Sequence, residues 1–489
     1  MHNFIQLKWQ RALPALLALA AAVRVGPLFL GYEHYGDAPA RIELAERWAR
    51  APHLWHGFVE AYQYGPLHLT LIGALVRLLG DRLAAARLLS FACGLSCVWL
   101  LYRITERERG REAAIWAGLA LALSPLHIQS STTGASEAVF LACFLAALLL
   151  ALRDQALLPA LLLGAAGLIR YDGWLYVPLF GALLFLRSRD LPRALGFCAL
   201  AAAPALLWIW VNGHWAGDPL APLHHIDADH ASLARGAIAA EGQLRFRLQG
   251  LFYWPFSVCV IATPLFGVFA IWGSARTLLR RERGWDLVAL AWIPAAYFTF
   301  RTAVLADFWP MSRFAMVAAA LSLVFAHDVL GLVRSSLRAL TIAVAVATPL
   351  VLTALCWNRT GAIAEHVRPV APIGSLPPGI AEAAAWLRTH ARPSDVVLLD
   401  HSDWYLDIPL AFASGLPESQ LIRASWKDDF DQRLRQRTPT LAVLVAPGSL
   451  GDRQADRFEF RGLRFCVAER YTYATVYRAC PDAEAIAPR

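Results

Sequence analysis

Long apolar runs recur along this chain from residue 12 almost to residue 357. Most hold roughly 17–22 residues, enough for a helix to cross a hydrocarbon core about 30 Å thick. The chain is therefore interpreted as a polytopic α-helical membrane protein. The pattern predicts about eleven transmembrane helices, near Ala12–Leu30, Ala86–Ile104, Ala113–Ile128, Ser136–Leu152, Leu157–Ile169, Trp174–Leu186, Ala194–Val211, Leu251–Trp272, Leu287–Phe300, Met311–Leu330 and Ala339–Trp357.

Composition agrees with a membrane protein. Of the 489 residues, 57% are hydrophobic and 17% are charged, which is more apolar than an average soluble domain. The length exceeds what one hydrophobic core usually organises, so we expect a membrane part and at least one further unit. The net charge of +8 does not indicate nucleic-acid binding, because the arginines cluster in short segments between apolar runs.

The positions of arginine predict how the chain is oriented. When every arginine-rich segment is placed in the cytoplasm, the predicted helices alternate without exception. The N-terminus is then cytoplasmic and the C-terminus extracytoplasmic, in a bacterial inner membrane. Pro66–Leu79, which contains His68 and Arg77, must then lie in the outer interface rather than span. The arginine-rich segments are Lys8 with Arg11, Arg103–Arg111, Arg153, Arg187–Arg193, Arg276–Arg283 and Arg334 with Arg338.

Three large segments fall on the outer side in this topology: the loops 31–85 and 212–250, and everything after residue 357. We expect a multi-span domain at 1–357, a proline-rich linker at 358–378 and a small soluble extracytoplasmic α/β domain at 379–489. The elements expected in the last domain are a helix at 379–390, strands at 395–399 and 441–445, and a hairpin at 462–479.

Two of the eight cysteines, Cys466 and Cys480, lie in the polar C-terminal part. In an oxidising outer compartment they are expected to pair across the predicted hairpin, and the alternative is two unpaired thiols. No cysteine spacing resembles a zinc or iron–sulfur site. The other six lie within or at the edge of apolar runs, where cysteine behaves as a small hydrophobe: Cys93, Cys97, Cys143, Cys198, Cys259 and Cys356.

Asp37 lies just after the first apolar run and just ahead of an amphipathic helix pattern. Its carboxylate would therefore sit at the membrane surface, near the head group of a lipid-linked substrate. Pro39 suits the first turn of the following helix, so an N-cap is the structural alternative for Asp37.

Several short motifs follow one another in an order that resembles a known group of enzymes. They are Asp37 after the first run, Tyr64-Gly-Pro-Leu-His68, Ala85-Ala-Arg87-Leu-Leu-Ser90, Leu123-Ser-Pro-Leu-His127-Ile, Ala135-Ser-Glu137-Ala-Val-Phe140, Ile169-Arg170-Tyr-Asp172-Gly-Trp174 and Ser312-Arg313-Phe314. Together they resemble the GT-C superfamily of membrane glycosyltransferases, in particular the protein O-mannosyltransferases and the lipid A aminoarabinose transferases. The resemblance covers roughly residues 10–357 and not the C-terminal domain.

The resemblance implies a carboxylate in the first outer loop that acts as general base, and only Asp37 matches it. In many members a second acidic residue follows directly, whereas this chain has Ala38. That departure puts a two-carboxylate or metal-assisted mechanism in doubt, so no cofactor is certain and a divalent cation remains open. A polyprenyl phosphate is already a good leaving group. The enzyme then mainly needs one base near the acceptor hydroxyl and cations for the departing phosphate.

Arginine suits a departing phosphate, because its planar fork holds phosphate oxygens bidentately. Arg170 and Arg313 fall at the outer ends of predicted helices and are the candidate donor-phosphate ligands. The alternative is that each extends its charge to lipid head groups. Glu137 and Asp172, on the same side, either pair with these arginines or bind sugar hydroxyls.

Other polar residues of the motifs are weaker candidates. Tyr64 and His68 are candidate substrate-binding residues through the resemblance. Arg24 and Arg87 lie within or at the edge of apolar runs, where arginine is costly unless it is paired or functional.

The second outer loop is dense in imidazoles and carboxylates. Three interpretations stay open for it: a transition-metal site, a solvated and partly mobile loop, and recognition of acceptor or sugar, for which His225 is the candidate. The residues are Asp218, His224, His225, Asp227, Asp229 and His230. The acidic cluster at Asp400–Asp407 is interpreted as loop polarity.

The sequence therefore predicts a glycosyltransferase that uses a polyprenyl-phosphate monosaccharide in the outer leaflet and inverts the anomeric carbon. The acceptor would be a hydroxyl of a lipid, a glycan or a protein. A multi-span transporter is the main alternative, although transporters often carry internal repeats and this sequence shows none. A sensor or assembly protein is a second alternative, but it would not need the acidic and basic residues of the outer loops.

Overall fold

A computed structural model describes residues 12–52, 64–333, 335–357, 376, 379–401, 407–424, 427–445 and 448–480 of the chain. It divides into two compact units. Of the described residues, the helical unit comprises 12–30, 41–52, 64–333 and 335–356, and the α/β unit comprises 31–40, 357, 376, 379–401, 407–424, 427–445 and 448–480.

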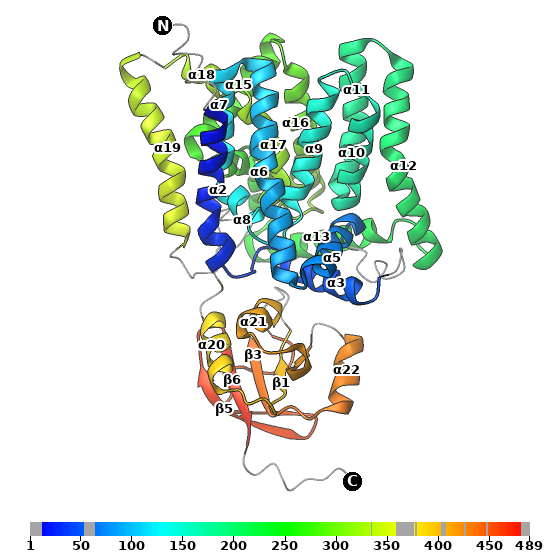
Figure 1. Ribbon diagram of the computed structural model, residues 1–489, viewed down its shortest axis with the longest axis vertical. Coiled ribbons are helices and arrows are strands. Elements are labelled where there is room, and N and C mark those ends of the chain that lie inside the picture. The colour runs from blue at the N-terminus through cyan, green and yellow to red at the C-terminus, as the bar shows by residue number, and fades with distance from the viewer. Residues whose placement is uncertain are drawn as a thin grey trace. The chain divides into compact units, whose positions relative to one another are not determined.

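The helical unit is built from helices that run side by side for most of its height (Figure 1). Its α-helices are α2 Ala12–Leu30, α3 Ala38–Arg50, α5 Pro66–Leu79, α6 Arg82–Arg109, α7 Arg111–Ala122, α8 Pro125–Ser130, α9 Glu137–Ala151, α10 Leu157–Ile169, α11 Tyr176–Ser188, α12 Leu191–Trp215, α13 Ala221–Glu241, α14 Gln243–Ile261, α15 Pro264–Arg280, α16 Trp285–Thr299, α17 Met316–Leu323, α18 Ala326–Leu330 and α19 Ser335–Trp357. Three short elements join them: the 3-10 turns η1 Tyr171–Leu175 and η3 Ser312–Ala315, and the π-helix η2 Phe300–Leu305.

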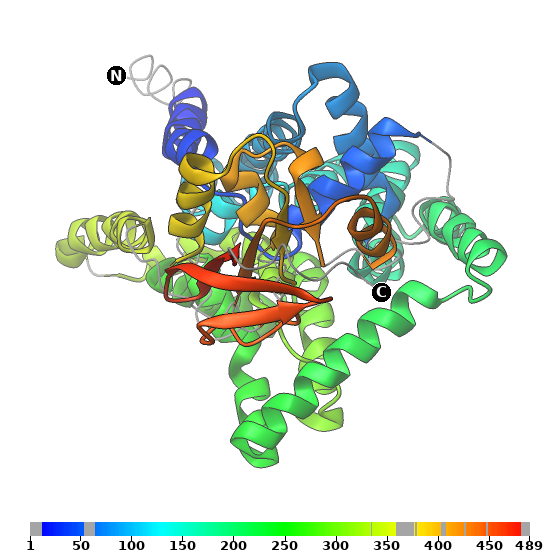
Figure 2. The same ribbon diagram turned by 90° about the horizontal axis from the view of Figure 1, so that it is seen from below.

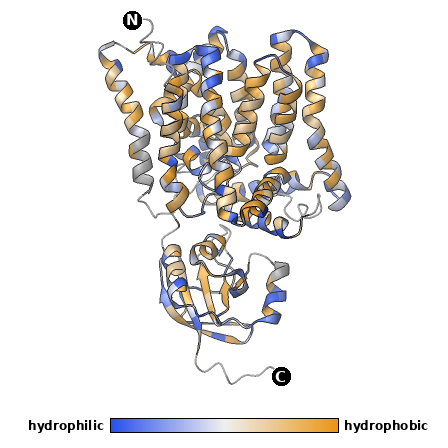
Figure 3. Cartoon of the chain, viewed as in Figure 1, coloured by the Kyte–Doolittle hydropathy of each residue, from blue (hydrophilic) through white to orange (hydrophobic). Residues whose placement is uncertain are grey.

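Apolar residues cover most of these helices, as Figure 3 shows. Within the described residues, four helices are long and apolar enough to cross a membrane: Ala12–Leu30, Arg82–Arg109, Leu191–Trp215 and Trp285–Leu305. Other apolar helices are shorter, among them α9 and α10. The structure thus confirms a mostly helical unit with apolar helices, without fixing the predicted number of spans.

Two predicted spans are interrupted. The run Ala113–Ile128 breaks between α7 and α8, and the run Leu251–Trp272 breaks between α14 and α15. Each break is two residues long and is followed directly by proline: Pro125 opens α8 and Pro264 opens α15. Proline lacks an N–H and disfavours a helical residue before it, so it begins a new helix and cannot continue the old one.

Ion pairs bring several arginine-rich helix ends to one face of the helical unit. Glu108, near the end of α6, lies 3.2 Å from Arg187 of α11 and 3.3 Å from Arg283, which follows α15. Arg109 pairs with Asp328 of α18 at 3.2 Å. These segments therefore share one face of the helical unit.

The segment expected as a loop at 212–250 is mostly the 21-residue helix α13. Figure 2 looks along the helix bundle and shows α13 lengthwise, across the direction of the bundle helices. The interpretation of this segment as a partly mobile loop was wrong, because its histidines and aspartates obscure a helical run rich in alanine. The segment Pro66–Leu79 forms the 14-residue helix α5.

The α/β unit contains one six-stranded sheet in the order β2-β1-β3-β6-β5-β4. Strands β2, β1 and β3 are parallel, and the pairs β3–β6, β6–β5 and β5–β4 are antiparallel. The strands are β1 Val397–Leu399, β2 Leu421–Arg423, β3 Leu441–Val445, β4 Arg457–Phe460, β5 Leu463–Arg470 and β6 Ala474–Ala479, and the helices are α20 Ile380–His390, α21 Asp407–Ser414 and α22 Lys427–Gln436.

Both faces of the central strands are buried. In β1, Val397 and Leu399 belong to one apolar cluster and Leu398 belongs to another. Successive side chains of a strand point to opposite faces, so β1 and β3 separate two apolar layers. A continuous apolar run is what a strand buried on both faces requires.

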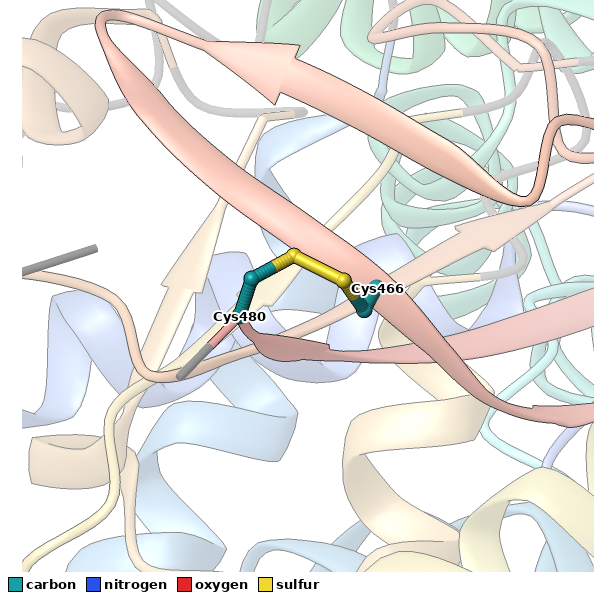
Figure 4. Close-up of a disulfide and its surroundings, with 2 residues drawn as sticks. All are labelled: Cys466 and Cys480. Carbon is teal, nitrogen blue, oxygen red and sulfur yellow. A yellow bond between two sulfur atoms is a disulfide. The ribbon is translucent and has the colours of Figure 1, made fainter. Parts of the chain in front are cut away.

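A disulfide joins Cys466 of β5 to Cys480, the residue after β6 (Figure 4). The two Cα atoms lie 5.2 Å apart. The bond closes the hairpin formed by these antiparallel strands.

Candidate active site

Arg170 is the centre of a buried ion-pair cluster in the helical unit. Helix α10 ends at Ile169, and Arg170 has extended backbone before the short turn η1 begins. Its Nη1 donates to Oε1 of Glu137 at 2.7 Å, and its Nε donates to Oδ1 of Asp172 at 3.0 Å. Only 8% of the Arg170 side chain is exposed, so this arginine does not extend into lipid head groups.

Arg313, in the turn η3, lies near the same aromatic ring as Arg170. The Cζ atom of Arg313 lies 5.8 Å from the centre of the Phe314 ring, and the Cζ atom of Arg170 lies 5.1 Å from it. An arginine near an aromatic face gains a favourable electrostatic interaction. The two arginines thus share one ring. The small pocket here is lined by Glu137, Phe140, Leu141, Arg170, Asp172, Arg313, Phe314, Met316 and Val317.

The motif around Tyr64 packs directly against the end of α10. A Cβ at Gly65 would lie 2.2 Å from the backbone oxygen of Leu168, so only glycine allows this approach. The Tyr171 hydroxyl donates to the backbone oxygen of Tyr64 at 3.2 Å, and Trp208 Nε1 donates to that hydroxyl at 3.0 Å. The Tyr64 segment is thereby fixed beside the turn that carries Arg170.

His68 is the buried polar side chain of this motif. It is fully buried, and neither ring nitrogen has a hydrogen-bond partner within the described part of the chain. Its ring faces the positive charges of Arg41 and Arg170. A buried polar group without a partner costs roughly 1–3 kcal/mol, so a bound water or ligand group is expected at this position.

Asp37 belongs to the α/β unit, whereas Arg170 and Arg313 belong to the helical unit. It lies in the turn immediately before α3, which begins at Ala38. In the same segment, Tyr32 packs against the apolar cluster of the α/β unit. The segment that carries Asp37 is therefore attached to the core of that unit.

The histidines of α13 have separate partners. His224 lies 2.7 Å from Asp218, and His225 lies 3.4 Å from Asp229. His230 instead contacts the backbone oxygen of Trp309 at 2.8 Å. Across the described ranges, no group of three histidine, cysteine or acidic side chains is arranged to hold a metal ion. His225 does not line the pocket of Arg170.

Arg24 is fully buried and is bonded to α7, α8 and the turn that follows α8. Its Nε donates to Ser131 Oγ at 2.7 Å, its Nη2 contacts His127 Nδ1 at 2.8 Å, and its Nη1 donates to the Ala122 oxygen at 3.0 Å. These bonds satisfy polar groups that the break after α7 exposes. Arg24 therefore stabilises the fold.

Phe140 and Phe314 belong to the sequence motifs, but the sequence assigned no role to the aromatic residues around the arginines. Phe140 lies 5.9 Å from Arg170, and Phe298 stacks on Phe314 with ring centres 5.9 Å apart. Phenylalanine is common in every apolar run, so only its position beside a buried arginine marks it. His230, which belongs to the same aromatic group, was noted only as a loop histidine.

The family described as dolichyl-phosphate-mannose-protein mannosyltransferase matches residues 63–215. That segment contains Tyr64, His68, Glu137, Arg170 and Asp172, but neither Asp37 nor the segment of η3. Among curated protein sequences, none matches this chain.

Two solved structures have a similar fold over nearly the whole chain. ArnT from Cupriavidus metallidurans bound to undecaprenyl phosphate is 15% identical, with a TM-score of 0.59 over 97% of this chain and 99% of that chain. The same protein in the apo state is 16% identical, with a TM-score of 0.59 over 97% of this chain and 98% of that chain.

The chain has the fold of the GT-C membrane glycosyltransferases, and it is a multi-pass membrane protein. The recognition of this superfamily from the sequence motifs is thereby confirmed. The chain is similar to ArnT in overall fold, and to the mannosyltransferase family over the segment that contains most of the residues lining the pocket.

Proposed function

We propose that the protein transfers a monosaccharide from a polyprenyl-phosphate carrier to an acceptor hydroxyl on the outer face of a bacterial inner membrane. The observation that carries this proposal is the pair of arginines, Arg170 and Arg313, which both lie near the ring of Phe314 within an apolar helical unit. Burying charge there is costly, which favours a function for the pair. The similarity to ArnT, whose structure holds undecaprenyl phosphate, supports a lipid-linked donor.

The donor phosphate lies between the two guanidinium groups in this proposal. Arg170 is already bonded through Nε and Nη1 to its two carboxylates, so its guanidinium is held in one orientation. A pre-oriented fork interacts strongly with phosphate oxygens and stabilises the charge that grows as the sugar leaves. Glu137 and Asp172 would then orient Arg170 and contact sugar hydroxyls.

Asp37 is the proposed general base. Its carboxylate accepts the proton of the acceptor hydroxyl while the acceptor oxygen attacks the anomeric carbon. The bond from that carbon to the phosphate oxygen breaks, and its electron pair leaves with the phosphate, so the anomeric centre inverts. The position of Asp37 after α2 and the resemblance of the motifs support this role. A divalent cation is not needed for this step.

Tyr64, His68 and His225 are proposed to bind the sugar or the acceptor. His68 has the strongest support, because two buried ring nitrogens without partners suit hydrogen bonds to a polar ligand. The orientation proposed for the chain places the N-terminus in the cytoplasm and the α/β unit outside. The disulfide of the α/β unit fits an oxidising compartment.

The decisive experiment supplies the purified protein with a panel of polyprenyl-phosphate sugars and measures sugar transfer by mass spectrometry. Transfer from at least one donor, lost in Arg313→Ala, supports the proposal. If no donor is used while the protein moves a labelled polyprenyl-phosphate sugar across proteoliposomes, the chain is a transporter.

A further inference from the structure

The segment that carries Arg313 lies in a break of the helical unit. Helix α16 continues as the π-helix η2, which ends at Leu305, and the next residue, Ala306, has a left-handed backbone. The chain then runs without regular structure to Met311, and η3 begins at Ser312. A broken helix leaves backbone oxygens without partners, and in an apolar environment each must be satisfied by other groups.

Side chains from α13 and α14 supply those partners. Arg247 of α14 donates to the oxygens of Ala303 at 3.1 Å and Val304 at 2.6 Å. His230 of α13 contacts the oxygen of Trp309 through Nδ1 at 2.8 Å. A carbonyl oxygen only accepts, so Nδ1 of His230 carries the proton.

The ring of His230 belongs to a group of aromatic side chains that includes Phe308 and Phe314. This group contacts Arg170 and Arg313 through Phe314. The His230 ring stacks on Phe308 with ring centres 4.1 Å apart and an interplanar angle of 15°, and it lies 5.7 Å from the ring of Phe314. Burial lowers the pKa of His230 to about 4, so the ring is neutral near pH 7. A neutral ring does not repel the nearby guanidinium of Arg313.

A second contact holds the same face of α13 against this segment. Asp227, three residues before His230, accepts from Arg301 Nη1 at 2.8 Å. The Nε of Arg301 donates to Asp307 at 3.0 Å. Residues three apart share a helix face, so α13 contacts both η2 and the irregular segment after it.

We propose that His230 is a positioning residue for the donor-phosphate site. Its hydrogen bond to Trp309 and its stacking on Phe308 fix the ring of Phe314, and with it the adjacent Arg313. Because Phe314 also contacts Arg170, a shift of this ring changes the spacing of the two arginines. This inference rests on the proposed function and assigns a role to α13, which forms no part of the pocket lining.

The test measures the affinity of the purified, full-length protein for undecaprenyl phosphate alone. His230→Phe keeps an aromatic ring and removes the N–H donor, and we expect Kd to rise between about three- and tenfold, the effect of one lost hydrogen bond. The matched control is His224→Phe, on the same helix, because His224 is exposed and pairs with Asp218. Its Kd should equal that of the wild type.

The outcomes separate this inference from the function on which it rests. A wild-type protein that binds no undecaprenyl phosphate overturns both. Wild-type binding with an unchanged Kd in His230→Phe overturns the positioning role alone. If His230→Phe lowers Tm, the variants His230→Asn and His230→Ala are compared instead, because the amide N–H of asparagine can replace the lost donor. The Kd of His230→Asn must then lie closer to the wild-type value than the Kd of His230→Ala. Equal Kd values for these two variants reject the positioning role.

Discussion

Arg170 Nη1 lies 2.7 Å from Oε1 of Glu137, and both side chains are buried in the helical unit. The two residues are 33 positions apart in the chain, and their bond joins the first residue of α9 to the residue that follows α10. Removing one partner of a buried ion pair typically costs about 3–5 kcal/mol, because the remaining charge stays buried. Arg170 therefore serves stability as well as any contact with a ligand.

Arg313→Ala tests phosphate binding at the second arginine of the pocket. We expect KM for the donor to rise about ten- to a hundredfold, the effect of losing a hydrogen bond to a charged group. Arg313→Lys should recover little, because a lysine presents no planar fork. Arg153→Ala, at an exposed arginine outside the pocket, is the control. Steady-state kinetics that match the wild type in Arg313→Ala would remove Arg313 from the donor site.

Arg170→Ala should instead lower both donor use and stability. It leaves Glu137 and Asp172 facing each other without their shared cation, and two like charges in a buried site repel. Thermal unfolding in the same detergent measures the second effect: Tm should fall in Arg170→Ala and stay at the wild-type value in Arg153→Ala, at an exposed arginine. Equal Tm values in these two variants would contradict the structural role of Arg170.

The disulfide should be detectable in protein extracted without reductant. Cys466 and Cys480 are expected to resist alkylation in the denatured, unreduced protein and to react after reduction. Closing a loop of this size stabilises a domain by about 3 kcal/mol. Peptide mass spectrometry measures both states, and alkylation of both thiols before reduction would argue against the bond.

The protein should become less stable in acid because His230 is buried as a neutral ring. Its pKa is lowered to about 4 in the folded protein from 6.5. Between these values the unfolded chain binds a proton that the native state does not, so the free energy of unfolding falls as pH drops from about 6.5 to 4. The charged groups that face this ring are Arg301, Arg313 and Asp227. Tm measured from pH 7.5 to 4.5 should decline more in the wild type than in His230→Phe, and parallel curves would refute this.

The orientation of the chain is open to a direct test. Two kinds of reporter are fused after Trp357, one active only outside the cytoplasm and one active only inside it. We expect activity only from the first. The ion pairs that gather Glu108, Arg187 and Arg283 on one face agree with a shared side for these segments. A reporter that is active at this position only in the cytoplasm would reverse the topology and exclude an extracytoplasmic Asp37.

The sequence predicted the elements whose patterns are local. Strand β3 occupies Leu441–Val445 as predicted, because a strand buried on both faces is a short β-branched run. The breaks at Pro125 and Pro264 escaped prediction, because proline also occurs inside membrane helices when neighbouring groups satisfy the backbone. Helix α13 was missed because its polar residues resemble a loop.

The site was predicted only in part, for a different reason. Arg170 and Asp172 are only two residues apart in sequence, and their pairing was among the expected alternatives. The contact of Arg170 with Phe314 depends on how the end of α10 meets η3, which no local pattern encodes. The partners of His230 likewise lie about 80 residues further along the chain.

Asp37→Asn separates general base catalysis from helix capping. Asparagine keeps the shape and much of the capping ability of aspartate, but its amide cannot accept the proton of the acceptor. Loss of a general base typically lowers the rate by about 10²–10⁴, whereas loss of a cap costs roughly 1 kcal/mol of stability. We therefore expect nearly complete loss of transfer, with unchanged Tm and unchanged binding of undecaprenyl phosphate.

Asp81→Asn is the matched control, because Asp81 is an N-cap whose carboxylate accepts from the backbone N–H groups of Leu83 and Ala84 at 2.8 and 3.0 Å. It should leave turnover unchanged. If Asp37→Asn kept more than about a tenth of wild-type turnover, a value outside the range for a general base, the base would have to be another carboxylate. Glu137 is not the first choice, because its carboxylate is already paired with Arg170. Glu33 and Glu43 would then be tested next, by the same substitution to the amide.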